Sequence, residues 1–164
     1  MKTRVLFVCM GNICRSPSAQ GIFSHLLEQR GLADRCEVDS AGTIAFHTGS
    51  PPDQRAQTAA KLRGIDLSGL RARQVSPEDF EVFDYILAMD EDNLSDLITQ
   101  APEVHRDKIS LIMADAGWLD GGEVPDPYYG GVSGFEQVLD MLETACNGLI
   151  DRVLQGELSS SGSD

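Results

Sequence analysis

The sequence predicts an α/β fold, a single three-layer domain in which helices cover both faces of a four-stranded parallel sheet. Strand-like segments at residues 4–9, 36–40, 83–89 and 108–113 alternate with helical patterns along the chain. Residues 5–8 and 85–88 are apolar at every position. Such continuous apolar runs are typical of parallel strands that are buried on both faces.

The helices are predicted from apolar spacing and from end signals. After the first strand, Ala19, Ile22 and Phe23 follow the i, i+3, i+4 rule of an amphipathic helix, which Gly31 can end. Three further helices are expected to begin near Asp53, near residues 76–77 and at Asp90, and a long amphipathic helix is expected at residues 135–154.

Length and composition indicate one domain. A chain of 164 residues can bury a sizeable core. The last six residues are serine, glycine and aspartate, a composition too polar to pack. We therefore predict a folded domain over residues 1–157 and a disordered tail over residues 158–164.

Charge and cysteine usage exclude several classes of protein. The net charge of −13 argues against a nucleic-acid partner, because no basic surface is available to contact phosphates. No stretch approaches the roughly 20 apolar residues that a membrane helix requires. The four cysteines are scattered, which favours a reducing compartment and hence the cytoplasm. The sequence has no Cys-x-x-Cys, and its three histidines lie far apart, so a structural zinc site is not expected. No other metal and no cofactor is expected.

The first strand ends in a short segment that could hold an anion. Cys9 ends the strand, and a helix is expected to begin near residues 16–17, with proline at its first position. Gly11 and Asn12 tolerate the positive φ that lets successive N–H groups converge on an anion. The helix N-terminus adds positive potential, and Arg15 can grip an oxyanion with two parallel donors.

The same arrangement would activate Cys9 as a nucleophile. A cysteine at a helix N-terminus beside an arginine can have its pKa lowered into the range of roughly 3.5–7.5. The hydroxyl of Ser16 could add a hydrogen bond to the sulfur. The alternative is a buried structural cysteine beside a solvated Arg15. A cysteine and an arginine six residues apart are by themselves only a modest signal for an active site. The full string at residues 9–17 is much more specific.

That string resembles the active-site loop of the low-molecular-weight protein tyrosine phosphatases. The resemblance runs from about residue 5 to residue 154, and it implies the family's α/β fold and phosphotyrosine hydrolysis. Further blocks that are similar to the family lie at residues 39–42, 49–53, 72–74, 83–90 and 126–129.

The resemblance also implies the roles of individual residues. Cys9 would be the nucleophile of a phosphocysteine mechanism, Arg15 would bind phosphate, and Asp126 would be the general acid. Ser40, together with Asn12, would hold the loop in shape. The other residues implied in substrate binding are Met10, Gly11, Asn12, Ile13, Cys14, Ser16, Phe46, Tyr128 and Tyr129.

Three positions near the site carry separate expectations. Many relatives have a histidine where this chain has Leu70, so any loop support from that position is absent or comes from another group. His47 follows Phe46 at the expected pocket rim and either tunes specificity or faces water. Cys14 is close enough in sequence to Cys9 for a reversible disulfide that would protect the nucleophile.

Other functions remain as alternatives. Arsenate reductases of related fold need further cysteines, and none lies between residues 62 and 145. Arginine phosphatases of the family tend to have threonine at the position of Ile13, whose bulk suits a phenyl ring better. A phosphate-binding module without catalysis would not need both Cys9 and Asp126. We expect a monomeric, metal-independent phosphatase whose substrate is a phosphotyrosine protein and whose competitors are phosphate and vanadate.

Overall fold

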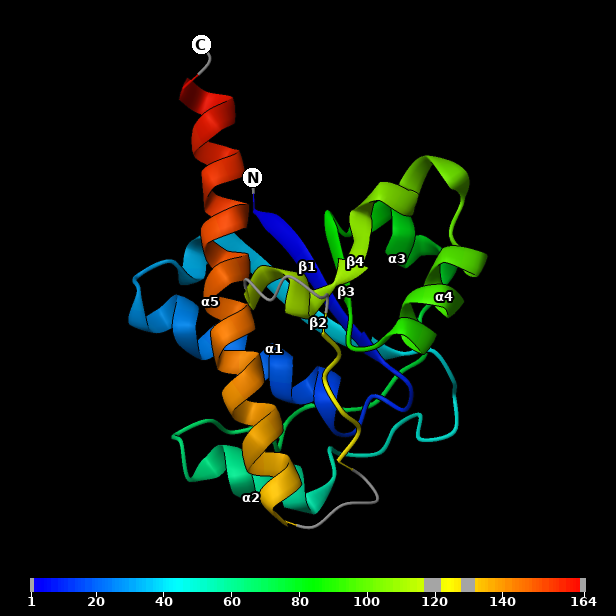
Figure 1. Ribbon diagram of the computed structural model, residues 1–164, viewed down its shortest axis with the longest axis vertical. Coiled ribbons are helices and arrows are strands. Elements are labelled where there is room, and N and C mark those ends of the chain that lie inside the picture. The colour runs from blue at the N-terminus through cyan, green and yellow to red at the C-terminus, as the bar shows by residue number, and fades with distance from the viewer. Residues whose placement is uncertain (1, 117–121, 128–131, 163–164) are drawn as a thin grey trace.

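Four parallel strands form the centre of the molecule in the computed structural model, which describes residues 2–116, 122–127 and 132–162 (Figure 1). Their order is β2-β1-β3-β4, so the first strand is central. The strands are β1 (Thr3–Cys9), β2 (Cys36–Gly42), β3 (Tyr85–Ala88) and β4 (Ile109–Leu111). The parallel register pairs Cys9 with Gly42 and Val8 with Ala88.

Helices cover both faces of this sheet, which confirms the predicted α/β fold (Figure 1). One face is covered by α1 (Arg15–Gln29), and α5 (Val132–Gly162) and α2 (Gln54–Lys61) pack with α1 in the same core. The other face packs against α3 (Pro77–Val82) and α4 (Glu91–Gln100). Short 3-10 helices complete the described chain: η1 (Ala33–Arg35), η2 (Glu103–Lys108) and η3 (Ile112–Ala116).

The apolar run of β1 is explained by these two covered faces. Val5 and Phe7 belong to the core under α1 and α5, whereas Leu6 and Val8 belong to the core under α3 and α4. All four side chains are fully buried. Burial of each such side chain stabilises the fold by about 1.5–3 kcal/mol. The central strand is thus held on both sides, and its carboxyl end is a rigid place for Cys9.

Several element boundaries were predicted wrongly: β2 extends to Gly42 instead of residue 40, and β3 covers only residues 85–88 of the predicted 83–89. The apolar run at residues 108–113 is a strand only to Leu111, because Ile112 and Met113 turn into η3 and bury their side chains in the core. The last helix begins at residue 132 rather than 135 and continues to Gly162. The domain boundary at residue 157 and the disordered tail after it stay predictions. In the part of the chain described, no helix is both long and apolar enough to span a bilayer.

Gly42 lets the end of β2 approach the loop that follows β1. A Cβ atom at this position would lie 2.7 Å from the carbonyl oxygen of Met10 and 3.2 Å from the carbonyl carbon of Gly11. The backbone of Gly42 also accepts from Val75 N–H and donates to the carbonyl of Arg73. Neither side can move easily, so a side chain here would displace the loop beside Cys9.

We therefore expect Gly42→Ala to lower the free energy of unfolding by about 1–3 kcal/mol, because it overpacks a rigid backbone contact. Urea denaturation measures this change. Gly69→Ala is the matched control, since a Cβ at Gly69 meets nothing within 4 Å. Equal stability of the two variants would contradict the close-approach argument.

Candidate active site

The candidate site lies at the carboxyl ends of β1 and β3, where an open parallel sheet binds its ligands. Cys9 is the last residue of β1, and a five-residue loop leads from it to α1. The helix begins at Arg15, so Pro17 is its third residue. The prediction that this proline is the first residue of the helix was wrong. The short loop therefore places Arg15 on the first turn, close to Cys9.

Only one of the two residues expected to have a positive φ in the loop has it. Asn12 has a φ of 58°, whereas the φ of Gly11 is not positive. Gly11 instead lies close to His47: a Cβ atom at Gly11 would lie 2.9 Å from the His47 ring, so a side chain there would displace that ring. The loop is thus shaped by a left-handed Asn12 and by a close contact between Gly11 and His47.

The sulfur of Cys9 receives two polar contacts. The backbone N–H of Asn12 donates to Sγ at 3.2 Å, and the Ser16 hydroxyl lies 3.0 Å from the same sulfur. Both groups can donate to a thiolate, which is the nucleophilic form of cysteine. The Cys9 residue is only 3% exposed, yet it lines the cavity of the site together with Met10 and Gly11.

Asn12 organises the polar network below the sulfur. Its Nδ2 donates to Ser16 Oγ at 2.8 Å and to Ser40 Oγ at 3.0 Å. Its Oδ1 accepts from the backbone N–H of Arg73 at 3.1 Å. Leu70, where many relatives would have a histidine, packs against the core instead. Loop support in this chain therefore includes the backbone of Arg73.

Arg73 is itself held in place by two carboxylates. Its guanidinium donates to both oxygens of Asp79, at 2.9 and 3.1 Å, and to Oδ2 of Asp39 at 3.2 Å. Burial by itself lowers the pKa of Arg73, but the hydrogen bonds and charges of Asp79 and Asp39 outweigh it and raise the pKa above its ordinary value. The residue whose N–H donates to Asn12 is thus held in place by two ion pairs.

Arg15 is buried beside Cys9 and is oriented by acceptors on one nitrogen. Nη1 donates to Asp90 Oδ2 at 2.6 Å and to the carbonyl of Val124 at 3.0 Å. Burial lowers the pKa of Arg15, but the charges of Cys9, Asp90 and Asp126 and the Asp90 hydrogen bond raise it overall. The guanidinium therefore keeps its charge although only 3% of the residue is exposed.

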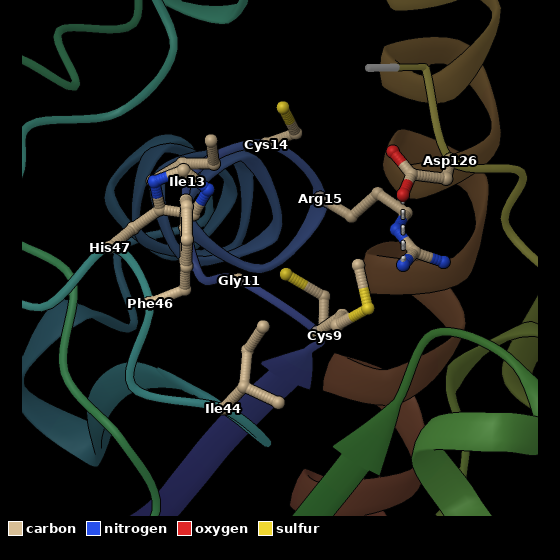
Figure 2. A pocket seen from close by; sticks show the side chains of 10 residues that line it. Cys9, Gly11, Ile13, Cys14, Arg15, Ile44, Phe46, His47 and Asp126 are labelled. Atoms are coloured by element: carbon tan, nitrogen blue, oxygen red, sulfur yellow. Dashed lines mark ion pairs between the residues drawn. The ribbon is translucent and has the colours of Figure 1, made fainter. Parts of the chain in front are cut away.

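Asp126 reaches the site from the segment that precedes α5. Its Oδ2 lies 3.8 Å from Nη2 of Arg15, and its side chain is 35% exposed (Figure 2). The structure therefore brings together the three residues expected to be catalytic. Arg15 follows Cys9 by 6 positions in the sequence, and Asp126 follows Arg15 by 111.

These residues surround a cavity of about 310 Å³. Figure 2 shows Phe46, His47 and Ile44 across the cavity from Arg15 and Asp126. Phe46 is 82% exposed and meets the His47 ring edge-on, with centroids 4.8 Å apart. The lining residues are Cys9, Met10, Gly11, Ile13, Cys14, Arg15, Ile44, Phe46, His47 and Asp126. The predicted binding residues Tyr128 and Tyr129 lie outside the described residues.

Cys14 also lines the cavity, with its thiol directed away from Cys9 in Figure 2. Burial, followed by the negative charges of Asp53, Cys9 and Asp126, raises the pKa of Cys14 far above the ordinary value of a thiol. Cys14 is therefore a thiol, not a thiolate, at neutral pH. The reversible disulfide between Cys14 and Cys9 stays a prediction.

Sequence reasoning missed several residues of the site. Asp90 was expected only to cap a helix, and its Oδ1 does accept from Asn93 N–H at 2.8 Å while Oδ2 binds Arg15. Asp90 directly follows a predicted strand, but only the structure shows that this strand lies beside the Cys9 strand. Ile44 and the Val124 carbonyl carried no signal, because tertiary folding alone brings them to the site. Among residues 2–116, 122–127 and 132–162, no group of three or more His, Cys, Asp or Glu could hold a metal ion.

Comparisons with known proteins agree with this site. The family model described as low molecular weight phosphotyrosine protein phosphatase matches residues 4–159. The human low molecular weight phosphotyrosine protein phosphatase is 41% identical over 151 residues, which cover 90% of this chain and 94% of the human protein. The low molecular weight protein-tyrosine-phosphatase YfkJ of Bacillus subtilis is 42% identical over 146 residues, with coverage of 89% and 92%.

A solved structure shows the same fold. The protein tyrosine phosphatase of Entamoeba histolytica, crystallised with Hepes in its active site, superposes with a TM-score of 0.91 at 40% identity. The match covers 95% of this chain and 99% of that one. This chain therefore belongs to the low molecular weight phosphotyrosine protein phosphatase family, whose members are cysteine-dependent protein-tyrosine phosphatases.

Proposed function

We propose that this protein hydrolyses phosphotyrosine in proteins, and small aryl phosphates, through a phosphocysteine intermediate and without a metal ion. One observation carries the proposal. The Cys9 sulfur, with hydrogen-bond donors beside it, lies on the floor of a cavity whose wall holds both a fixed Arg15 guanidinium and the Asp126 carboxyl group.

In the first step, the Cys9 thiolate attacks phosphorus. The S–P bond forms, and the bond between phosphorus and the tyrosine oxygen breaks. Asp126, protonated at this stage, gives its proton to the leaving phenolate oxygen. Arg15 and the N–H groups of the loop stabilise the charge on the equatorial oxygens, which is usually the largest contribution to phosphoryl transfer.

In the second step, a water molecule attacks the phosphocysteine. Asp126, now a carboxylate, accepts a proton from the water while the S–P bond breaks. The products are inorganic phosphate and the Cys9 thiolate, and the proton returns Asp126 to its starting form. The Arg15 guanidinium supplies in both steps the positive charge that a metal ion would otherwise provide.

The cavity wall supports tyrosine rather than arginine as the dephosphorylated residue. Ile13 is a branched apolar side chain that is 9% exposed and lines the cavity, as do Ile44 and Phe46. These three side chains offer apolar contact to a phenyl ring. We therefore place phosphoarginine second among the candidate substrates.

Hydrolysis assays on phosphopeptides test this proposal. The wild-type protein, with EDTA present, is offered three peptides that carry phosphotyrosine, phosphoserine or phosphoarginine at the same position. We expect turnover of the phosphotyrosine peptide, undiminished by EDTA and inhibited by vanadate. Faster turnover of phosphoarginine would overturn the substrate assignment, and loss of activity in EDTA would overturn metal independence.

Asp126→Asn is expected to slow hydrolysis of phenyl phosphate by about 10²–10⁴-fold, because a poor leaving group needs the proton that Asp126 supplies. With dinitrophenyl phosphate, whose leaving group needs no proton, the loss should be much smaller. Steady-state kcat values measure both. Asp92→Asn, an exposed first-turn aspartate of α4, is the matched control. Equal slowing of both substrates would argue against Asp126 as the acid.

The proposal extends to the setting of the enzyme. The four cysteines are scattered along the chain and do not have the spacing of a disulfide framework, which supports a reducing compartment such as the cytoplasm. We propose that the protein acts there as a monomer on phosphotyrosine proteins, with phosphate and vanadate as competitive ligands. Sedimentation analysis of the full chain tests the monomer.

A further inference from the structure

The polar network below Cys9 continues beyond Ser40 to Gln20, a residue of α1 that faces β2. The Ser40 hydroxyl donates to Gln20 Oε1 at 2.7 Å and is 4% exposed. The Gln20 amide nitrogen lies 3.5 Å from the carbonyl of Val38, to which it donates. Because that carbonyl can only accept, the amide oxygen of Gln20 faces Ser40.

Hydrogen-bond direction in this network is fixed by a backbone donor. The N–H of Arg73 can only donate, so the Asn12 atom opposite it must be Oδ1. Asn12 Nδ2 then donates to both hydroxyls, Ser16 and Ser40. Each hydroxyl must direct its own proton elsewhere. Ser40 has Gln20, whereas Ser16 has the Cys9 sulfur at 3.0 Å and, at the longer distance of 3.4 Å, the carbonyl of Ala41.

We infer that Gln20 is a positioning residue for Cys9. By accepting the proton of the buried Ser40 hydroxyl, Gln20 leaves Asn12 in the orientation that makes Ser16 donate to the sulfur. Without this acceptor, the Ser40 hydroxyl can be satisfied inside the network by Oδ1 of a flipped Asn12. That flip turns the Asn12 Nδ2 donor toward the Arg73 N–H donor, so the bond between them is lost. It also places Oδ1 beside the Ser16 hydroxyl, which then donates its proton to Asn12 instead of to Cys9.

Gln20→Leu tests the inference. Only the expected effect of this substitution on kcat rests on the proposed function. The direct measurement is the rate of Cys9 alkylation by iodoacetamide at pH 7, followed on the Cys9 peptide by mass spectrometry. We expect this rate, and kcat for phenyl phosphate, to fall by about 3–10-fold, the effect of one lost hydrogen bond. Gln20→Glu keeps an acceptor for Ser40 and should stay within about twofold of wild type. Gln29→Leu makes the same change on the exposed end of α1 and should change neither rate.

A double substitution separates this relay from a merely structural role. In a Ser16→Ala background the last donor is absent, so adding Gln20→Leu should slow alkylation no further. A folded Gln20→Leu protein that is alkylated at the wild-type rate would overturn the inference, as would additive effects of the two substitutions. Alkylation needs no turnover, so a failure of the proposed phosphatase activity alone would leave this measurement standing as an independent result.

Discussion

Cys9→Ser is expected to lower kcat for phosphotyrosine peptides by at least about 10⁴-fold, the order of loss seen when an enzyme nucleophile is removed. A hydroxyl in this position stays protonated, because the Asn12 N–H and the nearby Arg15 cannot lower its pKa enough to form an alkoxide. The loop and Arg15 are unchanged, so the variant should still bind phosphate. Residual hydrolysis and phosphate binding, measured on the same preparation, give both quantities.

Cys36→Ser is the matched control for this result. Cys36 is also a buried thiol, but it is the first residue of β2, at the end of the sheet opposite the site. We expect it to retain wild-type kcat once any loss of stability is taken into account. Full activity of Cys9→Ser, or equal losses in the two variants, would contradict the assignment of Cys9 as nucleophile.

Arg15→Lys should lower kcat by about 10²–10³-fold, the usual cost of removing one donor to transition-state charge. Lysine keeps the positive charge but has no planar guanidinium. In Arg15, Nη1 of that group binds Asp90 while Nη2 faces Asp126. KM should rise as well, because the same fork binds phosphate in the ground state. Steady-state kinetics with phenyl phosphate measure both parameters.

Arg30→Lys makes the same chemical change at an exposed position. Arg30 pairs with Asp151 at 2.7 Å on the surface, where an ion pair contributes little. We expect no change in kcat for this control. An Arg15→Lys enzyme with wild-type kcat would show that charge alone suffices, and that the geometry set by Asp90 and Val124 is not needed.

Local signals in the sequence were enough to predict the fold and the centre of the site. The apolar run at residues 5–8 predicted a parallel strand covered on both faces, because such a run is typical of strands buried in this way. The loop after it was predictable because Cys9 and Arg15 belong to one short segment. Their relation depends on turn geometry and a helix start, both of which are encoded locally.

The remaining parts of the site depend on contacts that no local pattern encodes. Asp90 binds Arg15 because β3 lies beside β1, and Arg73 supports Asn12 because its segment passes the end of β2. Gly11 was expected to serve a positive φ, but its φ is not positive, and what lies close to it is the His47 ring, 36 positions later in the sequence. Side chains that meet across the sheet can be placed only once the strand order is known.

The identity of the phosphorylated residue during turnover tests the central claim most directly. The Asp126→Asn enzyme, mixed with dinitrophenyl phosphate and quenched within one turnover, should accumulate the intermediate because its hydrolysis lacks a base. Peptide mass spectrometry should find one phosphoryl group on Cys9 and none on Cys14. Turnover without phosphate on Cys9, or with phosphate on another residue, would contradict the phosphocysteine mechanism.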